Sequence, residues 1–333
     1  MATFYVLLYR MHSVLKNAGL EALLRRWPRA GRELDQLKRR IQRHLWVRVQ
    51  SGLSRGMWMH LRLPGEAGYW RGTHEPDVQN AISAVVRPGT IVYDIGAHVG
   101  SIALGTARLV GDLGGVVAFD GDPENIVRLR GNSSRNGLGD CLQVVHAAVW
   151  SSTQSDGISF RRGSTVRSQG GVEANGNRPV LGNGELINVP AVTLDGFVAT
   201  GGPPPQLLKI DVEGGEYQVL LGGASLFANQ RPLIIAEVHH QLAAEQISVW
   251  LDEYQYCSQW NIPQEGFPQC LFAWPTEYDG AAWMQRTAQE RDLSGHPTAT
   301  KWMRQHLCSN NHTQKPKAAR YEAGKSQPCS RCL

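Results

Sequence analysis

The chain has 333 residues, of which 42% are hydrophobic and 19% charged. This composition supplies enough apolar material for a full core, and the length suits one large domain with appendages. No run approaches the ~18–20 apolar residues of a membrane-spanning helix. The apolar stretch 4–9 is too short for a signal peptide core. We therefore exclude membrane-spanning and exported classes and expect a cytoplasmic protein without a transmembrane segment.

The positive charge is concentrated at the N-terminus. Residues 1–60 hold 12 Lys/Arg and 3 Asp/Glu, a net charge of +9, which leaves −4 for the remaining 273 residues. Leucines at helical spacing predict two helices within residues 1–43, separated at Trp27-Pro28. We expect this basic segment to lie apart from the main domain. One hypothesis gives it a peripheral contact with an anionic surface, and the other gives it no partner.

The next part of the chain predicts a hairpin and a helix. Apolar and polar residues alternate over 45–63 around a Gly/Ser-rich turn at 51–56, which is typical of two antiparallel strands. A helix is predicted over 76–86, because Pro76 suits its first turn and Pro88-Gly89 ends it.

A regular alternation of strands and helices begins at residue 88. We expect strands at 90–94, 115–120, 141–148, 207–211 and 233–238, and helices at 100–110, 124–136, 215–222 and 241–252. Such alternation predicts an α/β fold, a doubly wound and mostly parallel sheet with helices on both faces. Late strands near 254–260 and 269–275 predict an antiparallel edge. The main domain is predicted over 44–280, with its core at 88–260.

Two stretches are predicted to lack regular structure. Residues 151–187 are rich in Gly and Asn, and we interpret them as irregular. Residues 281–333 are polar, and we expect a poorly ordered tail. Cys308, His312, Cys329 and Cys332 lie in that tail, but their spacing matches no standard zinc module, so we predict no metal there.

The first strand-to-helix turn reads Asp94-Ile95-Gly96-Ala97-His98-Val99-Gly100. A dinucleotide-binding fold has Gly-x-Gly-x-x-Gly here, because a pyrophosphate must approach the helix N-terminus. This turn lacks the middle glycine and adds Asp94. That pattern suits a ligand with an ammonium group and no pyrophosphate, as at the methionine end of S-adenosylmethionine (SAM). We predict cofactor contacts from Asp94, Gly96, Ala97, His98 and Gly100; a purely structural glycine turn is the alternative.

An acidic residue ends the second predicted strand. Asp120 lies 24 residues after Gly96, where a carboxylate can accept hydrogen bonds from ribose hydroxyls. We predict that Asp120 and the adjacent Gly121 contact the cofactor. Asp122 precedes Pro123 and Glu124, so we interpret it as a helix cap.

These motifs resemble the FkbM-type methyltransferases. The resemblance runs from about residue 57 to 255 and rests on 72–76, 94–100, 117–120, 122–125, 192–195, 209–214 with Glu216, and 236–239. It implies a Rossmann-like, SAM-dependent methyltransferase acting on a hydroxyl of a small molecule or sugar. It also implies that Glu75 lies near the cofactor or substrate. The sequence departs from the family's usual Asn at His98 and from its usual Glu-Pro at Asp120-Gly121.

Three residues at later strand ends are candidate catalytic groups. Asp211 and Glu213 follow a buried strand, and His239 ends the next one. A hydroxyl is a poor nucleophile, so methyl transfer benefits from a base, which any of the three could supply. Alternatively, Asp211 and Glu213 cap the following helix, or they bind a divalent cation with Glu237 and His239. We predict no resident metal.

Other function classes use the same kind of sheet. A nicotinamide-dependent oxidoreductase is the chief alternative, and a non-catalytic nucleotide-binding module is another. The turn without a middle glycine disfavours the first, and the strand-end acids disfavour the second. We expect a small-molecule or glycan acceptor and no nucleic-acid partner, since no aromatic platform accompanies the basic residues. The sequence makes no prediction of oligomeric state.

Overall fold

The structure is a computed structural model that describes residues 43–162, 171–172, 185–261 and 266–278. The helices predicted in the first 42 residues and the predicted tail after residue 280 lie outside these ranges and stay predictions. So do the four Cys and His residues of the tail. Within the described ranges, no helix combines the length and the apolar character needed to cross a bilayer.

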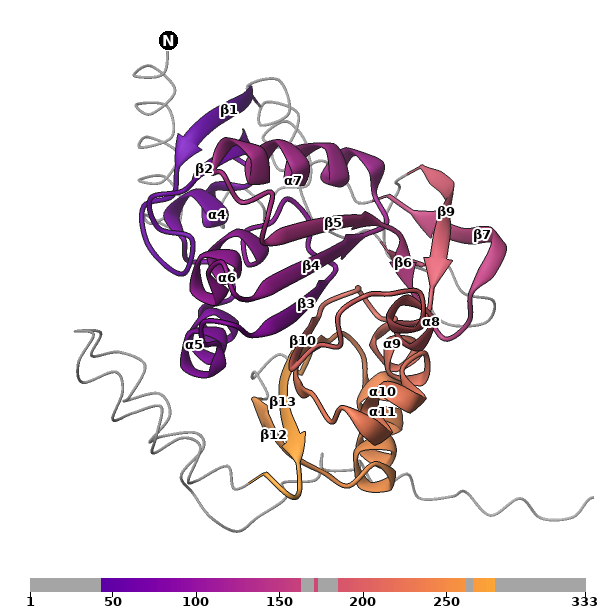
Figure 1. Ribbon diagram of the computed structural model, residues 1–333. Coiled ribbons are helices and arrows are strands. Elements are labelled where there is room, and N and C mark those ends of the chain that lie inside the picture. Colours follow the sequence, from indigo (N-terminus) through magenta and orange to yellow (C-terminus); the bar gives the residue numbers. More distant parts are fainter. Residues whose placement is uncertain (1–42, 163–170, 173–184, 262–265, 279–333) are drawn as a thin grey trace, which may run out of the picture.

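A seven-stranded sheet forms the centre of the molecule (Figure 1), with the order β12-β13-β11-β10-β3-β4-β5. The five neighbouring strands from β11 to β5 in this order run parallel to one another. The strand β13 pairs antiparallel with both β11 and β12. The strands are β3 (Ile91–Ile95), β4 (Gly115–Asp120), β5 (Leu142–His146), β10 (Leu207–Ile210), β11 (Leu233–Val238), β12 (Tyr256–Asn261) and β13 (Gln269–Pro275). The mostly parallel α/β sheet with an antiparallel edge is confirmed.

Helices cover both faces of this sheet. One face carries α5 (Pro76–Val85), α6 (Ala103–Val110) and α7 (Pro123–Arg135); the other carries α8 (Leu194–Ala199), α9 (Glu216–Leu221), α10 (Ala224–Asn229) and α11 (Gln241–Glu253). Successive side chains of a strand point to opposite faces. Val92 therefore packs in one core and Tyr93 in the other. The predicted cap is also present: the Asp122 side chain accepts a hydrogen bond from the Glu124 N–H at 2.8 Å.

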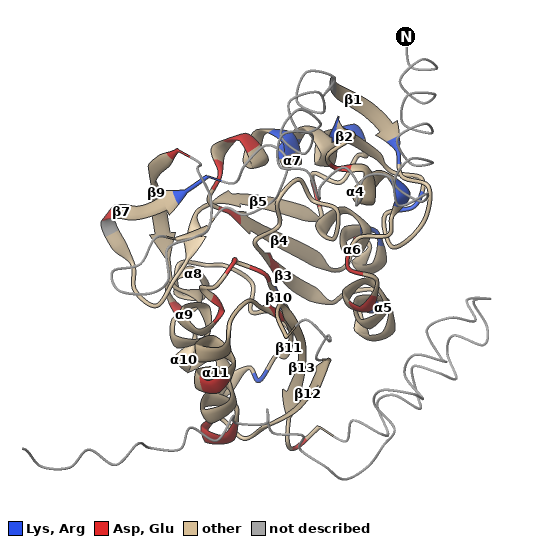
Figure 2. Cartoon of the chain, turned by 180° about the vertical axis from the view of Figure 1, so that it is seen from behind, with Lys and Arg blue, Asp and Glu red and all other residues tan. Residues whose placement is uncertain are grey.

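The predicted hairpin is present as β1 (Arg43–Arg48) and β2 (Trp58–Leu63), paired antiparallel. A short helix that was not predicted, α4 (Ala67–Arg71), follows it. Two contacts fix this unit on α7: Arg128 forms an ion pair with Glu66, and the His60 N–H donates to Asn132 at 2.7 Å. Figure 2 shows that basic residues gather around the hairpin and α7. The contacts bring the segment after β2 to the edge of the cavity described below.

A second, four-stranded sheet corrects the prediction for residues 151–187. Its order is β6-β9-β7-β8, with β6 (Ala148–Val149), β7 (Gln154–Arg161), β8 (Gly171–Val172) and β9 (Leu186–Val192). The prediction of an irregular stretch was therefore wrong for β7, β8 and the start of β9. The register of β7 on β9 shifts between Gln154 and Ile158, and Gly157 has a φ of 79°. This irregularity interrupts the alternation by which a strand is recognised in a sequence.

Candidate active site

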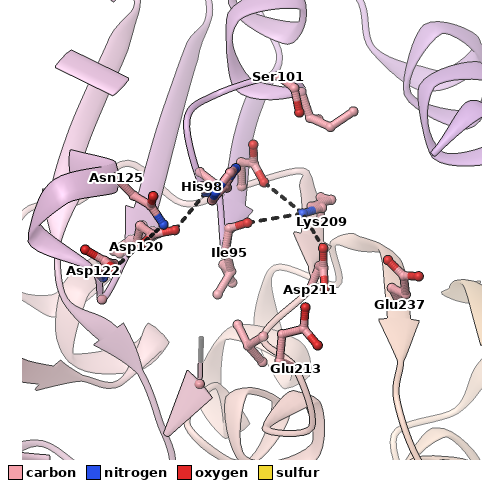
Figure 3. A pocket seen from close by; sticks show the side chains of 18 of the residues that line it. Ile95, His98, Ser101, Asp120, Asp122, Asn125, Lys209, Asp211, Glu213 and Glu237 are labelled. Atoms are coloured by element: carbon pink, nitrogen blue, oxygen red, sulfur yellow. Dashed lines mark hydrogen bonds and ion pairs between the residues drawn. The ribbon is translucent and has the colours of Figure 1, made fainter. Parts of the chain in front are cut away.

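A cavity of about 540 Å³ opens at the carboxyl ends of β3, β4, β10 and β11 (Figure 3). The order of the sheet reverses between β3 and β10, and such a switch point is where open α/β sheets bind ligands. The structure brings ten of the eleven predicted site residues to the walls of this cavity: Glu75, Asp94, Gly96, Ala97, His98, Asp120, Gly121, Asp211, Glu213 and His239. Gly100 is the exception.

The Gly96 turn joins three strand ends. The Gly96 and Ala97 N–H groups both donate to the Phe119 carbonyl at the end of β4. Gly96 has a φ of 80°, and a Cβ there would lie 1.7 Å from the Asp211 carbonyl oxygen. Glycine is therefore required by the close approach of two chain segments. Gly100 packs elsewhere, since its Cβ would lie 2.3 Å from Leu129, so the predicted cofactor contact of Gly100 has no support.

Asp94 is a buried carboxylate at this turn. Its side chain is 1% exposed, and neither oxygen accepts a hydrogen bond. The Lys209 ammonium lies 3.5 Å from Asp94 Oδ1, and it also lies 3.4 Å from Asp211 Oδ2. Burial raises the pKa of Asp94, and Lys209 opposes that rise. Oxygens without a hydrogen-bond donor in a cavity wall suit a ligand that brings N–H groups.

Lys209 is a site residue that the sequence reasoning missed. Burial alone would lower its pKa, but Asp211, Asp94 and Glu75 together raise it well above the usual value. The ammonium therefore keeps its charge and holds the acids of two neighbouring strands together. A signal existed in the sequence, because a lysine inside a short apolar strand must find an anionic partner when it is buried.

Asp120 lies at the end of β4 and is bonded mostly to the protein itself. Its carboxylate accepts hydrogen bonds from the His98 N–H at 2.8 Å, the Asp122 N–H at 2.8 Å and the Asn125 amide at 3.2 Å. Burial raises the pKa of Asp120 to about 7, although these hydrogen bonds lower it. A carboxylate has about four acceptor positions. One acceptor position thus remains for a ligand hydroxyl. This is compatible with the predicted contact to the ribose, but it leaves room for one hydrogen bond and not for several.

The neighbouring wall is aromatic and apolar. A Cβ on Gly121 would lie 2.7 Å from the Phe160 ring, which β7 places against this turn. Phe119, Val149 and Trp150 line the same cavity. A flat apolar ligand group can pack on such a surface. The glycine at position 121 is thus explained by its packing against the second sheet.

Three cavity residues have strained backbones. Glu75, His98 and Glu213 have φ values of 46°, 50° and 55°, a region that residues with a Cβ seldom adopt. Such strain persists where the surrounding structure enforces it, and it gathers at functional sites. His98 also has a buried Nδ1 without a partner, and burial lowers its pKa to about 4. His98 therefore offers a neutral imidazole to the cavity.

The second end of the cavity holds the predicted catalytic group. His239 Nε2 lies 3.6 Å from Asp211 Oδ1 and 3.4 Å from Glu213 Oε2. Burial alone would lower the pKa of His239, but a hydrogen bond with Glu216 and the nearby carboxylates raise it to about 10. Burial raises the pKa of Glu213 to about 8 and that of Glu237 to about 7. The pKa values of Glu213 and Glu237 thus lie near neutral pH.

Ligand atoms of Asp211, Glu237 and His239 lie within 4.8 Å of one another, a separation that a cation could bridge. Two positive charges already occupy this space. The Lys209 ammonium neutralises Asp211, and the raised pKa keeps His239 protonated at neutral pH. A cation would have to displace both charges. We therefore identify no metal ligands here.

Acidic groups dominate the lining as a whole. Among the described residues, the Lys/Arg side chains that line the cavity are Arg62 and Lys209, against eight carboxylic acids: Glu66, Glu75, Asp94, Asp120, Asp122, Asp211, Glu213 and Glu237. Two of these acids, Glu66 and Asp122, are held by arginines, Arg128 and Arg162. Both cationic side chains are already paired, Arg62 with Glu124 and Lys209 with Asp94 and Asp211. Neither is therefore free to bind a pyrophosphate.

Comparison with known proteins finds that part of this chain is similar to one family of methyltransferases. Residues 94–258 match the family model described as the methyltransferase FkbM domain. The hexuronic acid methyltransferase AglP of Haloferax volcanii is 26% identical over 180 residues, which cover 54% of this chain and 68% of that protein. The ribosomal protein L11 methyltransferase of Pelotomaculum thermopropionicum is 40% identical over 84 residues, 25% of this chain and 26% of that protein.

Among solved structures, the chain is similar to a methyltransferase FkbM from Methylobacillus flagellatus. The sequence identity is 15% and the TM-score 0.41, over 61% of this chain and 51% of that one.

Proposed function

Since this chain belongs with the FkbM methyltransferases and is a methyltransferase, we propose that it transfers the methyl group of SAM to a hydroxyl of a sugar or small molecule. The observation that carries the proposal is Asp94. Its buried carboxylate accepts no hydrogen bond, shares the Lys209 ammonium with Asp211, and stands at the cavity wall beside the Gly96 turn. An ammonium group satisfies such a carboxylate better than any part of a dinucleotide does.

The other residues of the cavity fit the rest of this cofactor. Asp120 keeps one acceptor position for a ribose hydroxyl. Phe160 and Trp150 offer an apolar wall to the adenine base. When bound, SAM supplies a methyl group on a positively charged sulfur. The cationic side chains of the lining, Arg62 and Lys209, are already paired with carboxylates, so they are not free to bind the pyrophosphate of a nicotinamide cofactor.

Glu213 is the general base of this proposal. Asp211 is neutralised by Lys209, and His239 holds its proton at neutral pH. Glu213 has a pKa of about 8 because of burial, and an effective base has a pKa near the working pH. Its carboxylate takes the proton that the hydroxyl oxygen loses as it is methylated. Before the transfer, the protonated His239 ring balances the charge of the Glu213 carboxylate from 3.4 Å away, and after the transfer Glu213 is a neutral acid.

The second substrate of this proposal is the methyl acceptor. Carboxylates at this end of the cavity accept hydrogen bonds from sugar hydroxyls, and the relative from Haloferax volcanii acts on a hexuronic acid. These facts support a glycan or a polyhydroxylated small molecule as acceptor.

The test is methyl transfer itself. The purified chain is incubated with isotopically labelled SAM and panels of sugars, nucleotide sugars and small hydroxylated molecules, and labelled products are identified by mass spectrometry. We expect a methyl ether on one acceptor class, and Glu213→Gln should remove most of the product. Label transfer to amines or carbons alone would overturn the assignment to hydroxyls.

A further inference from the structure

A buried acid that the proposed reaction does not use lies directly behind His239. Glu216 is the first residue of α9, and its side chain is 0% exposed. Its Oε1 lies 2.8 Å from His239 Nδ1 and also accepts the Gly214 N–H at 2.9 Å. Its Oε2 is buried without a partner. A carboxylate placed so deeply has a cost that a purely structural contact leaves unexplained.

The two ring nitrogens of His239 face different partners. Nδ1 points at Glu216, away from the cavity, whereas Nε2 points at Asp211 and Glu213. A carboxylate accepts hydrogen bonds, so Nδ1 carries a proton and donates it to Glu216. The ring can then rotate only by breaking this buried bond. Nε2 is therefore the nitrogen presented to the acceptor end.

The next residue, His240, also connects the end of β11 to the loop after β10. His240 accepts the Ala243 N–H through Nδ1 at 3.1 Å, and its Nε2 lies 3.2 Å from the Gly214 carbonyl oxygen. The loop after β10 is thus bonded to the end of β11 at two points, one through Glu216 and one through His240. This double attachment holds Glu213, whose φ is 55°, in its strained position beside His239.

We propose that Glu216 is a positioning residue, which fixes the His239 ring through Nδ1 so that Nε2 faces Glu213 and the methyl acceptor. This inference rests on the proposed function for its role in the reaction, but the fixed ring can be observed without the reaction. The charged groups that face the ring are Glu216 from α9, Asp211 and Glu213 from the loop after β10, Glu237 from β11 and Glu75 from the start of α5.

The first measurement is nuclear magnetic resonance of histidines labelled with ¹⁵N, between pH 5 and 9. The spectrum of His239→Gln identifies the His239 signals. In the wild-type chain both ring nitrogens of His239 should stay protonated throughout, because the pKa is raised to about 10. In Glu216→Gln, which keeps the shape and removes the charge, His239 should titrate within this range. A wild-type His239 that titrates near its ordinary pKa would overturn the proposal, even if no variant folds.

The second measurement is kinetic. Glu216→Gln should lower kcat about 10- to 100-fold, as a misplaced catalytic group does, with the KM for SAM nearly unchanged. Adding this change to His239→Gln should cost no more, because both act through one ring. Glu245→Gln, an exposed change on α11, is the matched control and should leave kcat unchanged.

The two measurements separate the two ideas. A chain that methylates no hydroxyl, yet shows the expected titration of His239, would refute the proposed function and leave the fixed ring intact. Equal pH profiles of kcat in wild type and Glu216→Gln, with only a lower melting temperature, would show a merely structural role for Glu216 and refute the positioning proposal.

Discussion

Gly96 and Asp211 are in direct backbone contact, although 115 positions of sequence separate them. A Cβ on Gly96 would lie 1.7 Å from the Asp211 carbonyl oxygen, and the Asp211 N–H donates to the Ile95 carbonyl. The Gly96 turn lies on the cofactor side of the cavity, and Asp211 lies on the acceptor side. Their contact therefore holds the two sides together. The two halves of the site cannot move apart without breaking the junction of β3 and β10.

We expect Gly96→Ala to damage stability and cofactor binding together. The positive φ alone costs about 1–2 kcal/mol, and the clash with Asp211 must also push the two strand ends apart. Gly56→Ala is the matched control, because Gly56 has a φ of 82° and its Cβ would meet nothing within 4 Å. Thermal melting and calorimetry with SAM measure both effects. Equal behaviour of the two variants would contradict the contact.

Asp94→Asn should weaken SAM binding, and it should also lower stability, because it removes one carboxylate from the buried Lys209 ammonium. A hydrogen bond to a charged group contributes about 1.5–3 kcal/mol, which corresponds to a roughly 10- to 100-fold rise in Kd. Asp195→Asn is the control: its carboxylate accepts the Ser225 and Leu226 N–H groups at 2.8 Å and lies outside the cavity. That variant should lose stability and keep its SAM affinity. An unchanged Kd in folded Asp94→Asn would remove Asp94 from the binding site.

The rate should depend on pH through Glu213. Its pKa is raised to about 8 by burial, and a general base works in its deprotonated form. We therefore expect kcat/KM to increase as pH rises and to level off above about 8. In Glu213→Gln, kcat should fall by about 10²–10⁴-fold, and the increase near pH 8 should disappear. If Glu213→Gln kept the full rate and the same pH profile, Glu213 would not be the general base and would only cap the following helix.

Stability should fall as pH rises from 6.5 to 8.5. Glu213, Glu237 and Asp120 have pKa values of about 8, 7 and 7 in the folded chain, above the 4.5, 4.5 and 3.8 of the unfolded one. His239 is raised from 6.5 to about 10. In this window the folded chain thus binds more protons than the unfolded chain, and raising the pH favours unfolding.

Melting temperatures measured across this window check the sign. Glu213→Gln should flatten the dependence, because one of the raised carboxyl groups is gone. A melting temperature that climbs between pH 6.5 and 8.5 would show that these carboxyl groups are not buried as described.

The alternation of strands and helices was sufficient to predict the main sheet. Local patterns place each strand, and the ends of parallel strands must meet at one edge, so Asp94, Asp120 and Asp211 could be expected together. The pattern failed where local geometry broke it. β7 contains a register shift near Gly157, and the six-residue α10 is too short to show helical periodicity.

The relationships inside the site were harder to predict, because they join distant residues. The sequence predicted a cofactor contact from Gly96, with a structural glycine turn as the alternative, and the structure shows Asp211 in the space that a Cβ on Gly96 would fill. Gly100 has a similar explanation in Leu129. Lys209 and Glu216 stood inside recognised motifs, but their partners come from other strands: Asp94 for the first and His239 for the second. Pairings of this kind depend on tertiary contacts that no local pattern contains.

The central claim is that this acidic cavity binds SAM. Isothermal titration calorimetry of the purified chain with SAM, and separately with NAD, tests it most directly. We expect one SAM site with a Kd in the micromolar range, a binding free energy of about −8 kcal/mol, and no measurable NAD binding. Tight binding of NAD with no heat from SAM would contradict the account.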